Sequence, residues 1–87
     1  MEEKNEILFN LEGKICNVMI LNKSGNTVLY GKQKIKIRSN ILSLIDLDIR
    51  IDTQQLEITS HNDKKGIFIG LRLLNHEDIE ALTILGM

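Results

Sequence analysis

The feature that most constrains the fold of this 87-residue chain is an alternation of apolar and polar side chains with a period of two. It is strictest in residues 45–52, where every second residue is Ile or Leu and the residues between them are charged. Successive side chains of an extended strand point to opposite faces. The alternation therefore predicts strands, each with one apolar and one charged face, through most of the region between residues 6 and 73.

Glycines and clusters of Asn, Ser and Asp divide this region into six or seven predicted strands. The predicted strands cover residues 6–11, 14–21, 27–30, 32–38, 45–52, 56–60 and 66–73. The segments 22–26 and 62–66 are predicted turns, because their residues tolerate a positive φ or hydrogen-bond their own backbone. Gly31 is expected to mark a bulge or bend.

The last dozen residues change their period. Asn75 is a good helix N-cap, Asp78 can act as in a capping box, and Ile79 and Leu82 follow helical spacing. A sheet of six strands exposes edges unless it curls shut. We therefore expect one mainly β domain over residues 1–87, a six-stranded antiparallel barrel or roll with one C-terminal α-helix packed across its end.

The composition excludes several classes of protein. The net charge is −1, from 11 basic and 12 acidic residues, which gives no long-range field to attract nucleic acid or an anionic membrane. The aromatic residues are only Phe9, Tyr30 and Phe68, which disfavours base-stacking and carbohydrate sites. The single cysteine, Cys16, cannot form an internal disulfide, and no segment is typical of a signal peptide or membrane span. We expect a soluble cytoplasmic protein with no membrane partner.

The most conspicuous group of side chains is a basic stripe at positions i, i+2, i+4 and i+6 of one predicted strand. It consists of Lys32, Lys34, Lys36 and Arg38. One interpretation is a platform for the phosphates of a nucleic acid or nucleotide. The favoured one is charge pairing with the next predicted strand, with Arg38 opposite Asp46, Lys36 opposite Asp48 and Lys32 opposite Asp52.

No group of residues predicts catalysis or a bound metal. Cys16 lies in an apolar strand and is expected in the core. His61 and His76 are far apart in the chain, without the ligand spacings that zinc requires. The aspartates at 46, 48 and 52 are expected to be solvated partners of the bases. We therefore expect no enzyme, no catalytic residue, no metal and no cofactor.

The order of these parts resembles the PilZ domain, a six-stranded barrel with a C-terminal helix found in bacterial cyclic-di-GMP signalling. In that family a strand leads into a turn of the type Asp/Asn-x-Ser-x-x-Gly. Asn22 and Ser24 match the first two positions, whereas Thr27 stands where the glycine belongs. The segment 69–73 is similar to the last strand of the family, but it lacks the aromatic residue.

The resemblance implies a degenerate, PilZ-like regulatory adaptor that acts through protein contacts in bacterial signalling or motility. Ligand-binding members carry an Arg-x-x-x-Arg segment before the barrel, and here no arginine precedes Arg38. This absence disfavours direct binding of cyclic-di-GMP, because clamping phosphates and stacking on guanine require the planar guanidinium group. Only Asn22 and Ser24 carry over as ligand-binding positions.

Two other functions stay open on the sequence. One is a small nucleic-acid-binding barrel of the OB or SH3-like type that uses the basic stripe, and the other is a phage or host-defence inhibitor that acts by docking. Tyr30 and Phe68 are the candidate residues for a protein contact. A homo-oligomer formed along a strand edge is compatible with each of these functions.

Overall fold

The computed structural model of the chain describes residues 2–62 and 66–86. Within these residues the chain forms helix α1 (Glu2–Phe9), seven strands and two short 3-10 turns, η1 (Ile45–Leu47) and η2 (Thr53–Gln55). The strands are β1 (Ile15–Asn22), β2 (Thr27–Arg38), β3 (Ile41–Leu44), β4 (Ile49–Asp52), β5 (Leu56–Asn62), β6 (Phe68–Leu73) and β7 (Ile79–Leu85). No helix in this part of the chain has the length and apolarity needed to cross a membrane.

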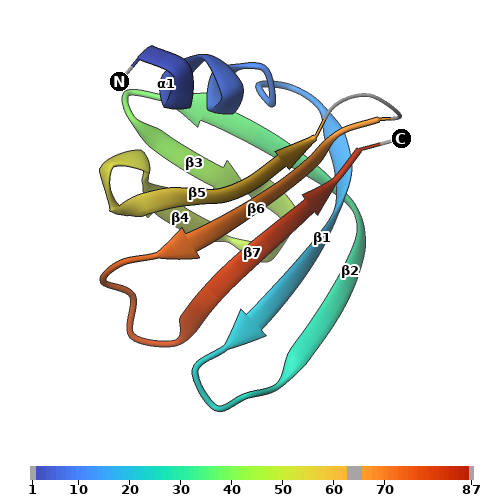
Figure 1. Ribbon diagram of the computed structural model, residues 1–87. Helices are drawn as coiled ribbons and strands as arrows, with labels where there is room; N and C mark the ends of the chain where they lie inside the picture. Colours follow the sequence, from blue (N-terminus) through green and yellow to red (C-terminus); the bar gives the residue numbers. More distant parts are fainter. Residues whose placement is uncertain (1, 63–65, 87) are drawn as a thin grey trace.

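The strands form a single antiparallel sheet in the order β4-β3-β2-β1-β7-β6-β5. The sheet curls into a half-barrel, and α1 lies over one of its ends (Figure 1). The two edge strands, β4 and β5, follow each other in the chain and are joined by η2. The prediction of a mainly β, curled antiparallel sheet is confirmed, with one strand more than the six expected.

The concave side of the sheet holds an aliphatic core. Among the described residues sixteen buried apolar side chains form it, and none of these is aromatic. They are Leu8, Leu11, Cys16, Val18, Ile20, Ile35, Leu42, Leu44, Ile51, Leu56, Ile69, Leu71, Leu73, Ile79, Leu82 and Ile84. Burying one such leucine or isoleucine stabilises the fold by about 1.5–3 kcal/mol, so the two-residue alternation is what closes the sheet on itself.

The predicted C-terminal helix is wrong, because residues 79–85 form strand β7 between β1 and β6. Leu21 pairs with Ala81, but the next residue, Asn22, pairs with Ile79, so Glu80 is an extra residue in β7. This β-bulge turns both Ile79 and Leu82 to the core, although they are three residues apart. A spacing that indicated a helix in the sequence thus comes from an irregular strand.

The helix of the structure lies at the other end of the chain, where a strand over residues 6–11 was predicted. Glu, Lys and Leu are strong helix formers, and they dominate α1. Leu8 and Leu11 are 1% and 0% exposed, so α1 and the turn after it plug the end of the half-barrel. The Lys4 Nζ donates to the Leu56 carbonyl at 3.0 Å and ties α1 to the start of β5.

The predicted strand 45–52 is interrupted in the structure. Ser39 and Asn40 both have positive φ, 50° and 63°, and form a tight turn directly after β2. This turn pairs β2 with residues 41–44 instead of the segment beyond them. Residues 45–47 then form η1, Asp48 is left-handed with φ 55°, and extended structure resumes only at Ile49. Residues 63–65 of the predicted turn 62–66 lie outside the described residues.

Candidate functional site

The outer side of β2 carries the four basic side chains as predicted. Lys32, Lys34 and Arg38 are exposed and Lys36 is half-buried, whereas Gln33 and Ile35 between them point inward and are buried. Side chains on one face of a strand repeat about every 6.6 Å, so the four cations form a nearly linear row. The prediction from the alternation, that these four side chains share the outer face of one strand, is therefore confirmed.

The neighbouring strands add a fifth cation to this row. On β3, Ser43 lies opposite Lys36, and on β4, Arg50 lies opposite Ser43. Lys36, Ser43 and Arg50 thus form one cross-strand line on the outer side. We call the group of Lys32, Lys34, Lys36, Arg38 and Arg50 the basic face.

The carboxylates predicted to neutralise the basic stripe do not lie opposite it. Ile41 faces Arg38, and Ser43 faces Lys36, because the turn at Ser39 and Asn40 sets this register. Asp52 pairs instead with Ile41, and its carboxylate accepts the Gln54 backbone N–H at 2.8 Å. The predicted charge pairing was therefore wrong.

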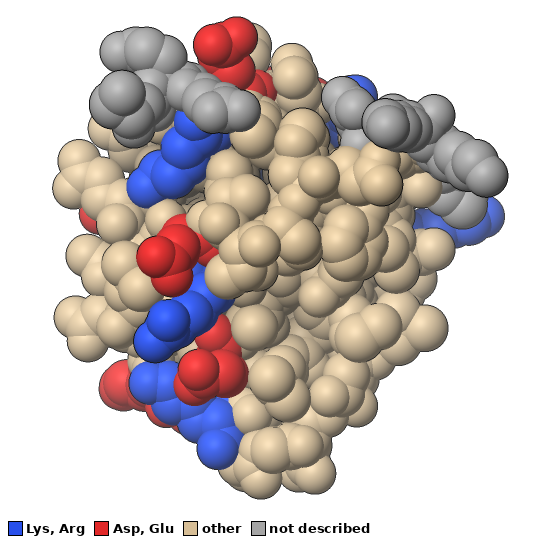
Figure 2. Space-filling view, viewed as in Figure 1, with Lys and Arg blue, Asp and Glu red and all other residues tan. Residues whose placement is uncertain are grey.

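No carboxylate of the described residues lies within ion-pairing distance of the basic face. The ion pair found among the described residues lies elsewhere, between Arg72 on β6 and Glu57 on β5, which are 3.7 Å apart. In Figure 2 the outer surface of β6 and β7 is largely uncharged, with basic and acidic side chains alternating along one side of it. The row on β2 differs from that surface, because its four charged side chains are all basic and form no ion pair with another described residue.

A β-bulge shapes one end of the basic face. Gly31 and Lys32 together lie opposite Asn17, whose Oδ1 accepts the Lys32 backbone N–H at 3.0 Å. Lys32 has φ 49°, a left-handed conformation that is unfavourable for a residue with a side chain. The bulge expected at Gly31 is confirmed, and it turns Lys32 outward beside Lys34.

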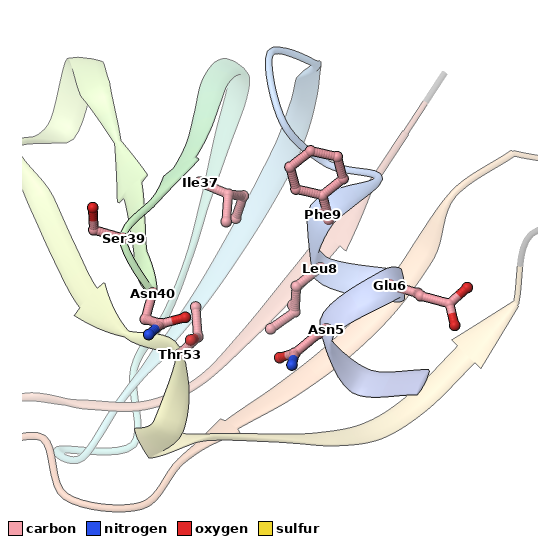
Figure 3. A pocket seen from close by; sticks show the side chains of 8 residues that line it. All are labelled: Asn5, Glu6, Leu8, Phe9, Ile37, Ser39, Asn40 and Thr53. Atoms are coloured by element: carbon pink, nitrogen blue, oxygen red, sulfur yellow. The ribbon is translucent and has the colours of Figure 1, made fainter. Parts of the chain in front are cut away.

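A cleft lies at the other end of the basic face, between α1 and the turn from β2 to β3. Its volume is about 640 Å³. It is lined by Asn5, Glu6, Leu8, Phe9, Ile37, Ser39, Asn40 and Thr53 (Figure 3). Leu8 and Asn5 point from α1 towards Asn40 and Thr53, whereas Glu6 points away from the gap. Arg38 lies between two lining residues in the chain but does not line the cleft itself, because its side chain is on the outer side of β2 and Ile37 points towards α1.

A second cavity, of about 400 Å³, lies at the open end of the half-barrel. It brings Asn22 and Tyr30 together with Asp48, Arg50 and residues of the loop before β7. In that loop His76 Nδ1 accepts the backbone N–H groups of Asp78 and Ile79, both at 3.0 Å. The polar residues that predicted a helix cap therefore close a loop between two strands.

The other predicted positions are not brought together. Ser24 is exposed in the turn after β1 and accepts a hydrogen bond from the Asn26 side chain at 3.4 Å, away from the cavity that Asn22 lines. Tyr30 pairs with the buried Val18 on the inner side. Phe68 is 38% exposed at the start of β6, where it pairs with Asn62 and Leu85, whereas Tyr30 on β2 lines the second cavity.

The groups that sequence analysis considered for catalysis or metal binding are apart from one another. In the part of the chain that the structure describes, no three His, Cys, Asp or Glu side chains are close enough to hold a metal ion. Cys16 is buried, which raises the pKa of its thiol, while the positive charge of Lys14 acts in the opposite direction. The thiol is therefore kept neutral at physiological pH, the form that is a poor nucleophile.

Comparison of the chain with family models, with curated proteins and with solved structures finds no match in any of the three. Its function therefore has to be inferred from its own residues. Sequence analysis missed Arg50, Phe9 and the turn at Ser39 and Asn40. The dipeptide Ser-Asn after a strand is a feature that could have located the turn, and with it the register of the basic face.

Proposed function

We propose that the protein is a small non-enzymatic module that binds single-stranded nucleic acid along its basic face. The observation that carries the proposal is the row of unpaired cations on the outer side of β2, with Arg50 beside it. The sequence alone favours a different interpretation of these cations, in which carboxylates of the next strand neutralise them. The structure removes its basis, because serine and isoleucine stand where carboxylates were expected.

The shape of the basic face supports a single strand as the ligand. Lys34, Lys36 and Arg38 follow each other on one face of β2, where side chains repeat about every 6.6 Å. This spacing is close to the distance between successive phosphates of an extended single strand. Lysine ammonium groups bind phosphates as point charges without demanding a sequence, so we expect binding of low sequence specificity.

The distribution of charge supports the same ligand. The whole chain has a net charge of −1, so the five cations of the basic face leave an excess of acid on the rest of the chain. Phosphates are repelled from the remainder and attracted to one face, which orients the nucleic acid. A buried, unpaired Cys16 suits the cytoplasm, where such a ligand is present.

The functions implied by the PilZ resemblance stay predictions. One part of that resemblance, a helix from Asn75, is absent, because residues 75–78 form a loop and Ile79–Leu85 form β7. Contact with a partner protein, binding of cyclic-di-GMP through Asn22 and Ser24, and docking as an inhibitor each lack an observation in the described residues that favours a particular partner.

The test is fluorescence anisotropy with a labelled single-stranded oligonucleotide of mixed sequence at low salt. Lys34→Glu should weaken binding about fivefold or more, since it removes a charge-assisted contact worth roughly 1 kcal/mol or more and adds repulsion. Lys23→Glu is the matched control. Lys23 is exposed on the turn at the other end of β2, so the same change of charge there should alter affinity little.

Equal effects of the two substitutions would contradict the proposal. Tighter binding of an acidic polypeptide such as poly-glutamate than of the oligonucleotide would contradict it as well, because it would assign the basic face to a protein partner.

A further inference from the structure

We propose that the cleft between α1 and the turn from β2 to β3 is a subsite for one base of the strand that lies along the basic face. This inference rests on the proposed function and deepens it. The cleft lies at the end of β2 that carries Arg38, and Ile37 and Ser39, its neighbours in the chain, both line it from the other face of the strand. A strand whose phosphate is held by Arg38 reaches the cleft by passing around the turn at Ser39 and Asn40, which joins the two faces at this end of β2.

Phe9 supplies a stacking surface at this position. It is 65% exposed, the highest value among the large apolar side chains in the described residues. Exposing a large aromatic ring to water is unfavourable. Phe9 is nevertheless held in this exposed position, because its buried neighbour Leu8 anchors α1. Proteins that bind single strands stack bases on aromatic rings. Phe9 lines the cleft and offers such a ring there.

Polar groups around the cleft can contact the edge of a base. The side chains of Asn5, Ser39 and Asn40 have no hydrogen-bond partner among residues 2–62 and 66–86. Their amide and hydroxyl groups can both donate and accept, as base edges require. Asn5 and Asn40 lie at the gap beside the apolar side chains of Leu8 and Ile37 (Figure 3), and Ser39 lines its margin. This combination of an apolar floor and a few polar groups is typical of a small-ligand site.

The charge at the cleft is compatible with a nucleotide. Glu6 is the acidic residue among the lining residues, and it points away from the gap in Figure 3. Glu12, which lies between α1 and β1, has its carboxylate engaged as acceptor of the Ile37 backbone N–H. Neither carboxylate therefore closes the path from Arg38 to the cleft.

The test uses the absence of tryptophan from the chain. Phe9→Trp introduces a single indole fluorophore whose emission is quenched when a base stacks on it. Phe68→Trp is the matched control, since Phe68 is a partly exposed phenylalanine on β6, which does not line the cleft. Both proteins are titrated with the labelled oligonucleotide, and anisotropy of the label reports binding in the same samples.

We expect saturable quenching of the indole emission in the Phe9→Trp protein. The midpoint of this quenching should agree with the midpoint of binding that anisotropy gives, and the Phe68→Trp protein should show no quenching. An oligonucleotide of abasic sites should bind through its phosphates without quenching either protein. Binding by anisotropy with unchanged emission of the Phe9→Trp protein would overturn the subsite and leave the proposed function intact. Absence of binding by anisotropy in the unsubstituted protein would overturn the proposed function itself.

A second variant tests the subsite without a new fluorophore. Phe9→Leu keeps an apolar side chain at an exposed position but lacks the aromatic face, so the fold should be retained. Loss of one stacked base is expected to weaken binding roughly five- to 150-fold. Unchanged affinity of a protein with an unchanged melting temperature would count against the subsite.

Discussion

At the scale of single residues, Lys32 is the position where the basic face and the stability of the fold conflict. Its φ of 49° is one that residues with a Cβ rarely adopt, and the bulge opposite Asn17 imposes it. A glycine would adopt this conformation without strain. Strained residues are often found at functional sites, and a lysine here adds a cation to the outer side of β2.

Replacing Lys32 with glycine should therefore stabilise the protein and impair binding. Relief of the left-handed strain outweighs the greater chain entropy of glycine, so we expect the free energy of unfolding in urea to rise by about 0.5–1 kcal/mol. Affinity for the oligonucleotide should fall, because one cation is lost. The control is Lys34→Gly at an ordinary strand position, which should lose stability. Equal destabilisation by both substitutions would argue against strain at the bulge.

At the scale of the elements, the sequence predicts strands where the alternation is uninterrupted. The strands β1 and β5 lie close to their predicted positions, and β6 lies within its predicted range. The two strands predicted over residues 27–30 and 32–38 form the single strand β2, and β3 was not predicted. The three errors have a common physical origin, because local pattern does not report pairing between strands. The bulge at Glu80 imitates helical spacing, η1 and the left-handed Asp48 interrupt the alternating segment 45–52, and α1 is held by Leu8 in the end of the half-barrel.

The candidate site, like the fold, was predictable from the sequence only in part. The outward direction of the lysines follows from the period of two in the sequence. The lack of opposing carboxylates does not follow, because it depends on the register that a two-residue turn selects. The cleft beside Phe9 was not predictable either, since the sequence placed Phe9 in a strand and not at the end of a helix.

The assignment of β7 as a central strand can be tested by amide hydrogen exchange. Its neighbours β1 and β6 pair with it on both sides, so the backbone N–H groups of Leu82 and Ile84 should exchange as slowly as those of β1. Edge strand β4 should exchange faster. Nuclear Overhauser contacts between Met19 and Thr83 should accompany the slow exchange, whereas sequential helical contacts over residues 79–85 would contradict the strand.

At the scale of the whole molecule, the fold separates its surfaces by charge. The half-barrel has a basic row on the outer side of β2 and a cleft under α1 at the end of that row. The outer surface of β6 and β7, in contrast, is largely uncharged (Figure 2). A chain of nearly neutral net charge can thus present a local cationic track, which the composition alone did not indicate.

The salt dependence of binding tests the central claim most directly. Each phosphate contact with a single strand contributes about −0.7 to the slope of log K against log salt, so four or five contacts predict a slope of about −3. Replacing Lys34 and Lys36 together with glutamine should reduce the steepness by about 1.4, whereas Lys23→Gln should leave it unchanged. A slope near zero, or the same slope in all three proteins, would contradict binding of nucleic acid along the basic face.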